Sequence, residues 1–323
     1  MKPAFSVIFL TTLIGAAQGL FLALFTHQSY ALFGLLPMQS DAFYGYGSVL
    51  ALLLLVGGLI ASFFHLGRPE RAWRSATKWR TSWLSREVIV LPAFMGVVFL
   101  FGLSHLTGYR PEVVSLPGGL IVDLSTVLGV IGTMLAFALF ICTAMIYACL
   151  RFLREWHSPL TVINYILMGG ASGFVLAAFY SASAAPDQAD FFAGWAIIIT
   201  MLAFAGRWAS LVRNARLKPK STLQTAIGIK HPHIVQRSMG AMGGTFNTRE
   251  FFHGKSAAFM RAIKPAFLIL TFVLPLALLA LGILTPGLLA LAFIIQYLGL
   301  LAERWFFFAQ ANHPQNLYYQ TIG

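Results

Sequence analysis

The sequence predicts an all-α fold: a polytopic membrane protein with an eight-transmembrane-helix bundle and both termini in the cytoplasm. Of its 323 residues, 58% are hydrophobic and only 10% are charged, with a mean hydropathy of +0.78. An ordinary soluble domain has about 25% charged residues. Eight apolar runs are each about long enough to cross a bilayer, which takes roughly 20 residues. We therefore expect residues 1–323 to form one integral membrane domain.

The predicted spans, in chain order, are residues 5–25, 46–64, 89–106, 120–150, 160–182, 191–211, 266–284 and 287–308. The first run has one basic residue, Lys2, ahead of it and resembles a signal peptide. Because seven further apolar runs follow, we interpret it as an uncleaved span. The one long polar segment, residues 213–264, is predicted to be a basic cytoplasmic loop.

The basic residues predict the orientation of the bundle. With eight spans, both termini share a side with the connections after spans two, four and six. That side holds 21 of the 22 Lys and Arg residues, and only Arg110 lies opposite. Positive residues are retained in the cytoplasm during insertion. Both termini, the loop at residues 65–88 and the long loop are therefore expected in the cytoplasm, and the net charge of +12 reflects topology rather than a nucleic-acid partner.

The sequence offers few candidate ligands for a metal centre. The two cysteines, Cys142 and Cys149, lie in one apolar run and are too few for an iron–sulfur or zinc site of four cysteines. His27 and His105 lie near the outer ends of spans one and three, so a haem between them is an alternative to two interfacial histidines bound to water. We expect no haem, iron–sulfur or molybdenum centre in this chain.

A secondary transporter is an alternative from another functional class. Transporters carry ionisable or broken-helix features near the membrane midplane. Here the charged residues cluster at span ends, and the midspan polar residues are few: Gln18, Asn164 and Gln296. The pattern weakens the transporter interpretation without removing it.

The long loop contains two features of interest. Gly240, Gly243 and Gly244 are spaced like part of a phosphate-binding loop, but no Gly-Lys-Ser/Thr follows them. Aromatic residues among Arg and His predict a docking surface for a soluble partner, formed by Phe246, Phe251 and Phe252. A basic loop near lipid headgroups is the alternative.

Residues 65–88, between spans two and three, are the most distinctive stretch. They hold six of the 22 Lys and Arg residues and three of the seven Trp, which places the loop at the membrane surface. His65 follows the end of span two and Glu87 precedes span three. Structural alternatives for these two are a helix-end histidine that reaches water and a glutamate paired with Arg86 or Arg80.

Two motifs in this stretch carry a family resemblance: His65-Leu-Gly-x-Pro-x-Arg-Ala and Leu84-Ser-x-Glu87. Together with the eight-span layout, they resemble the membrane anchor subunit of dimethyl sulfoxide reductase and its relatives. The resemblance implies a quinone cofactor, ubiquinone or menaquinone, with His65 and Glu87 in quinone binding and proton handling. It also implies that residues matching the pattern shape the site, namely Gly67, Arg71, Ser75 and Ser85.

The chemistry of these residue types agrees with the implied roles. Histidine titrates near neutral pH, and a partly desolvated carboxyl can exchange protons with water. Spans two and three are antiparallel neighbours, so we expect His65 and Glu87 to face one cleft.

The family resemblance also implies partners. They are a molybdopterin catalytic subunit and an iron–sulfur subunit, docked on the cytoplasmic face of an anchor held in membrane lipid. Two features resemble the anchors of cytoplasm-facing sulfite-oxidising enzymes: the long loop, and the predicted location of His65 on the basic, cytoplasmic side. We therefore expect the quinone-reactive anchor of a sulfite dehydrogenase, with a menaquinol-oxidising anchor of a dimethyl sulfoxide-type reductase as the alternative. The sequence leaves open the substrate, the direction of electron flow, the quinone, the oligomeric state and proton translocation.

Overall fold

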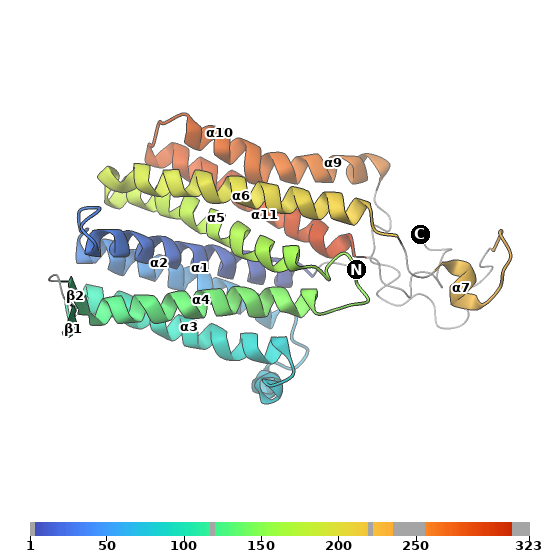
Figure 1. Cartoon of the computed structure of the whole chain (residues 1–323), viewed down its shortest axis with the longest axis horizontal. Helices are drawn as coiled ribbons and strands as arrows, with labels where there is room; N and C mark the ends of the chain where they lie inside the picture. The colour runs from blue at the N-terminus through green and yellow to red at the C-terminus, as the bar shows by residue number, and fades with distance from the viewer. Residues whose placement is uncertain (1–3, 117–119, 219–221, 235–255, 312–323) are drawn as a thin grey trace.

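Eight helices in the described part of the chain are long and apolar enough to cross a membrane, as predicted (Figure 1). The computed structural model describes residues 4–116, 120–218, 222–234 and 256–311. Seven spans are the continuous helices α1 (Phe5–Leu32), α2 (Asp41–Phe63), α3 (Trp83–Leu106), α4 (Leu124–Ala148), α5 (Pro159–Ala184), α6 (Ala189–Ala215) and α11 (Pro286–Ala309). The remaining span comprises α9 (Ala257–Leu268), the π-helical turn η3 (Ile269–Val273) and α10 (Leu274–Ala280). The chain is a multi-pass membrane protein.

Helices α1 and α5 form the centre of the bundle. In their most apolar windows, 61% and 72% of the residues are buried, against 28–44% in the other spans. The two helices approach closely through glycines: a Cβ added at Gly173 would lie 2.1 Å from the carbonyl carbon of Gly19. Small residues let transmembrane helices pack at short range. Helices α2, α3 and α4 lie on one side of this pair and α6, α9, α10 and α11 on the other (Figure 1).

The fourth span differs from its prediction. Residues assigned to a connection and to the start of that span form an antiparallel hairpin, β1 (Glu112–Leu116) and β2 (Leu120–Asp123). Asp123 then caps α4, its side chain accepting a hydrogen bond from Thr126 N at 2.8 Å. Such a cap fixes where a helix starts. The all-α prediction therefore missed one small hairpin, because apolar strand residues run directly into an apolar helix.

The seventh span is not a regular helix. Its π-helical turn η3 lies against Gly299 of α11, where an added Cβ would lie 2.5 Å from the Thr271 nitrogen. Gln296 of α11 donates a hydrogen bond to the Thr271 carbonyl oxygen at 3.3 Å. Single π-helical turns of this kind alter the local register of a helix.

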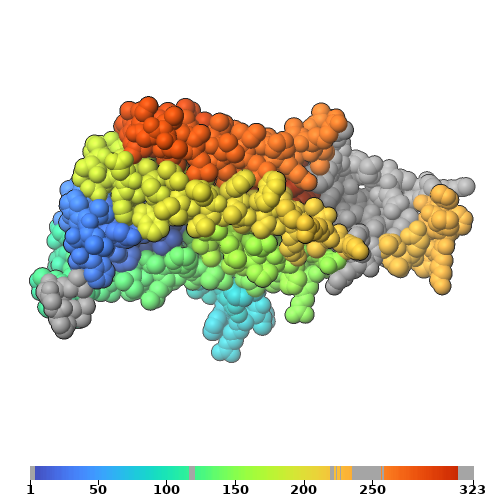
Figure 2. All heavy atoms as spheres, turned by 45° about the horizontal axis from the view of Figure 1, so that its top comes forward, coloured from blue at the N-terminus to red at the C-terminus, as the bar shows by residue number. Residues whose placement is uncertain are grey.

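The connection between α2 and α3 projects sideways from the bundle (Figure 2). It contains a 3₁₀ helix, η1 (Pro69–Lys78), which has no buried residue. Trp73 and Trp79 are 66% and 53% exposed, and Arg74 and Arg80 lie over their rings. Exposed indoles with basic neighbours suit the membrane surface. We call the bundle end at which α2 stops and α3 starts the basic end. The short helices η2 (Pro186–Gln188) and α7 (Leu223–Ile227) complete the described elements.

Candidate functional site

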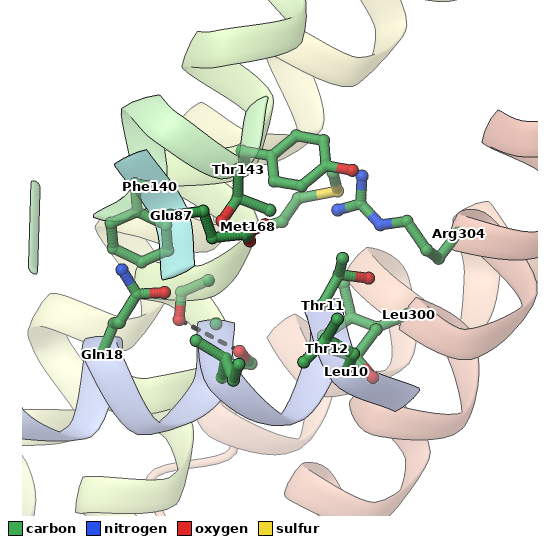
Figure 3. Close-up of a pocket in the computed structure, with 15 residues that line it drawn as sticks. Leu10, Thr11, Thr12, Gln18, Glu87, Phe140, Thr143, Met168, Leu300 and Arg304 are labelled. Carbon is green, nitrogen blue, oxygen red and sulfur yellow. Dashed lines mark hydrogen bonds between the residues drawn. The ribbon is translucent and has the colours of Figure 1, made fainter. Parts of the chain in front are cut away.

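A polar pocket lies inside the bundle near its basic end (Figure 3). Five helices line it, α1, α3, α4, α5 and α11, and α2 contributes no side chain. Its polar lining includes Thr11, Thr12, Gln18, Glu87, Thr143, Tyr165, Ser172 and Arg304. The rest of the lining is apolar or glycine. The pocket has room for about one or two water molecules.

Glu87 is the predicted site residue that lines this pocket. Ser82 caps α3 by accepting a hydrogen bond from Ser85 N at 3.4 Å, which places Glu87 in the second turn, facing the interior. The residue is only 9% exposed, and its carboxylate accepts a hydrogen bond from Thr143 Oγ1 of α4. Thus Glu87 is held by one neutral donor beside the pocket.

The ion pair considered for Glu87 is not formed. Arg86 stacks over the Trp83 ring at 4.1 Å and donates to the carbonyl oxygens of Trp79 and Arg80, each at 2.9 Å. Its guanidinium therefore ties the end of the surface loop to α3 and leaves the carboxylate of Glu87 to the pocket.

His65 lies outside the pocket, directly after α2. Its side chain is exposed, and this side chain makes no hydrogen bond to any residue that the structure describes. Exposed Phe63 and Phe64 precede it. Partial desolvation by neighbouring atoms lowers the pKa of the imidazole below 6.5, so the ring is mainly neutral at pH 7.

The other four predicted residues also lie outside the pocket, and two of them contact each other. Ser85 Oγ donates to the Ser75 carbonyl oxygen, and Ser75 Oγ donates to Ala72 O at 2.5 Å, which fastens η1 to the start of α3. Arg71 forms an exposed pair with Glu70 at 3.8 Å. A Cβ added at Gly67 would meet nothing within 4 Å, so packing does not require glycine there.

Sequence reasoning missed a buried ion cluster beside the pocket. Arg207 of α6 and Arg304 of α11 lie near the ends of the predicted spans 191–211 and 287–308, yet their side chains are only 2% and 5% exposed. Both flank Glu303, which is fully buried: Arg207 Nε lies 2.8 Å and Arg304 Nε 3.8 Å from its carboxylate oxygens. The signal was available, because charged residues inside apolar runs are rarely incidental.

The opposite end of the bundle holds the two histidines considered for haem. His27 lies within α1 rather than in a loop, with Nδ1 2.9 Å from Tyr44 Oη and Nε2 2.9 Å from Gln188 Oε1. His105 Nδ1 lies 3.0 Å from an Asp41 carboxylate oxygen. The Tyr44 ring lies against His105, with centroids 4.8 Å apart. Hydrogen bonds therefore engage both ring nitrogens of His27 and one of His105.

Arg110, the one Lys or Arg residue among the described residues of that end, links the hairpin to α2. It contacts Asp41 at 2.9 Å and Asp123 at 3.9 Å. Burial alone would raise the pKa of Asp123, but hydrogen bonds from Thr126 and Ser125, with the charge of Arg110, lower it. Arg110 thus offsets part of the negative charge of these two aspartates.

The side chains near the basic end fit a quinone by their chemistry. A quinone headgroup needs hydrogen bonds to its carbonyl oxygens and a group that exchanges protons, while its tail stays in lipid. His65 offers an unengaged imidazole beside exposed phenylalanines, and Glu87 offers a buried carboxyl. The pocket behind Glu87 has room for water but not for a quinone ring.

The two features predicted in the long loop lie outside the described residues. They are the glycines Gly240, Gly243 and Gly244 and the docking surface of Phe246, Phe251 and Phe252.

Comparison with known proteins agrees with the bundle and the loop motifs. Residues 1–309 match the family model described as DMSO reductase anchor subunit (DmsC). The chain is also 56% identical to a sulfite dehydrogenase subunit of Allochromatium vinosum over 325 aligned positions that cover 100% of both chains. A match of this extent spans every transmembrane helix, the surface loop and the pocket. The chain therefore belongs to the DmsC family of membrane anchor subunits of molybdenum oxidoreductases.

Proposed function

We propose that this anchor subunit is quinone-reactive and passes electrons from sulfite oxidation into the quinone pool. The observation that carries the proposal is the placement of Glu87, a buried carboxyl beside a polar pocket. Glu87 lies in the second turn of α3, and the loop that precedes α3 begins at His65. An anchor that only held its partners in the membrane would have no need of a buried carboxyl there, because burying one is costly.

Sulfite is proposed as the substrate of the complex because the Allochromatium vinosum relative is named as a subunit of a sulfite dehydrogenase. A molybdopterin subunit would oxidise sulfite, and an iron–sulfur subunit docked on the basic end would carry the electrons to the membrane. In membranes that contain the complex, sulfite should reduce added quinone. Quinol-dependent reduction of dimethyl sulfoxide without sulfite-dependent quinone reduction would contradict this direction and substrate.

The roles of the two residues follow from their surroundings. A bound quinone accepts two electrons and two protons as it becomes quinol. The neutral imidazole of His65 donates its N–H to a carbonyl oxygen and orients the headgroup. Glu87, held by Thr143, keeps a proton at its carboxyl and exchanges it with water in the pocket.

The orientation proposed for the chain places the basic end in the cytoplasm of the bacterial inner membrane, with both termini. Reporter fusions after Arg80 and after Lys230 should report the cytoplasm, and a fusion after Glu112 in the hairpin should report the outside. A periplasmic signal after Arg80 would reverse the proposed docking face.

His65→Ala should weaken quinone binding without touching sulfite oxidation. A hydrogen bond between neutral groups contributes about 0.5–1.5 kcal/mol, so the KM for quinone should rise about two- to tenfold. Below its lowered pKa, His65 becomes charged and its bond stronger, so the wild-type KM should fall as the pH decreases through that range. The variant should lose this pH dependence. Thr77→Ala, at an exposed residue of the same loop, is the control. An unchanged KM for quinone in His65→Ala would show that His65 does not bind the quinone.

A further inference from the structure

A second polar pocket adjoins the first, between the Glu87 pocket and the basic end of the bundle. The two share three wall residues: Tyr165, Met168 and Arg304. The second pocket is smaller than the first and has room for about one water molecule. Buried waters normally occupy cavities with several polar partners, and this lining provides Asn164, Ser210 and the ion cluster.

The second pocket extends the polar lining to the end of the bundle. Asn164 Nδ2 donates to Ser210 Oγ at 2.7 Å across α5 and α6. Farther out, Asn214 Nδ2 donates to the Glu155 carbonyl oxygen at 3.3 Å. Glu155 is half-buried in the connection between α4 and α5, where the chain leaves the bundle. Polar groups therefore continue from Glu87 to the basic surface.

Charged residues of both signs line this route. The two pockets are lined by three arginines and three glutamates, namely Arg207, Arg213, Arg304, Glu87, Glu155 and Glu303. The Arg304 guanidinium lies 3.9 Å from the Tyr165 ring centroid and is paired with Glu303. At the wall between the pockets, a proton therefore passes arginines that share a buried carboxylate, rather than an isolated guanidinium, which would repel it more strongly.

We propose that the two pockets form a water-filled proton path between Glu87 and the solution at the basic end. The inference rests on the proposed function, since quinone reduction consumes protons that must come from solution. Glu87 gives its proton to an oxygen of the reduced quinone, so its O–H bond breaks as the O–H bond of the quinol forms, and its carboxylate then takes a replacement proton from a neighbouring water. Successive transfers restore that water, so one proton is taken from the basic-end solution and no electron moves.

The test is to block the second pocket and follow water at Met168, in the wall that the pockets share. Asn164→Leu replaces a buried amide by an apolar group of similar size, and Ser210→Val replaces the hydroxyl of α6 by a larger apolar group. Gln28→Met is the matched control, because Gln28 is also a buried amide that donates to a serine hydroxyl at 2.7 Å, but in the opposite half of the bundle.

The first readout needs no quinone. The purified complex is mixed rapidly with ¹⁸O water, hydroxyl radicals are generated from bound water, and mass spectrometry measures ¹⁸O in oxidised Met168. We expect exchange at Met168 to slow at least tenfold in Asn164→Leu and Ser210→Val and to be unchanged in Gln28→Met. Wild-type exchange rates in both blocked variants would overturn the path.

The second readout separates the path from the proposed function. In the same preparations, quinone-linked turnover should fall at least fivefold in the blocked variants, while turnover with a soluble dye acceptor stays normal. Slowed exchange with normal quinone-linked turnover would show that the protons enter elsewhere and overturn the proposal. If the wild type has no quinone-linked turnover, the proposed function fails, and exchange at Met168 alone decides whether the water path exists.

Discussion

Glu87→Gln is expected to lower quinone-linked turnover about a hundredfold, since proton transfer by a positioned group contributes roughly 10²–10⁴ in rate. Glutamine has nearly the same shape, and its carbonyl oxygen can still accept the hydrogen bond from Thr143. It cannot hold or release the proton, so binding of quinone should change less than turnover. The measurement is turnover with quinone and with a soluble dye in membranes that contain the assembled complex.

Thr143→Val is the matched control for this change. It removes the hydroxyl that donates to Glu87 but keeps the carboxyl, and the two side chains have similar volume. We expect a fall in quinone-linked turnover of less than about tenfold, corresponding to one lost hydrogen bond of about 1 kcal/mol. Dye-linked turnover should be normal in both variants. Full quinone-linked activity in Glu87→Gln would show that the carboxyl has no part in the reaction.

Glu303→Ala should cause the largest loss of stability among single substitutions of charged residues. The change leaves Arg207 and Arg304 buried without their shared carboxylate. Breaking a buried ion pair by removing one partner costs about 3–5 kcal/mol, because the remaining charge stays desolvated. The purified chain should therefore unfold at a clearly lower temperature, which a thermal unfolding curve in detergent measures.

The control is an ion pair of the same chemistry at the surface. Arg71 and Glu70 lie 3.8 Å apart with side chains 51% and 66% exposed, and such pairs contribute at most about 1 kcal/mol. Glu70→Ala should leave the unfolding temperature nearly unchanged. Equal, small shifts for both variants would mean that the buried cluster is relaxed by water or rearrangement in the folded chain.

The sequence alone determined most of the architecture. Because backbone groups in lipid must be hydrogen-bonded within the chain, each long apolar run had to become a helix, and all eight did. The boundaries shifted where local chemistry outweighed hydropathy: α1 continues through His27 to Leu32, and the Asp123 cap starts α4 after a hairpin. The loop motifs around His65 and Glu87 also indicated the family, because they depend on residue identity rather than on packing.

Only the tertiary structure decided which polar residues meet. In the sequence, His65 and Glu87 lie at the two ends of one loop, but α3 turns Glu87 into the bundle, whereas His65 follows the end of α2 and is exposed. Glu87 instead shares its pocket with Thr143 and Arg304, which are 56 and 217 residues away along the chain. The sequence places Arg207 and Arg304 near span ends, whereas the packing of α6 against its neighbours and of α11 buries both beside Glu303. Hydropathy gives the length of a helix, whereas the face it buries depends on its neighbours, and those neighbours are set by packing across the whole bundle.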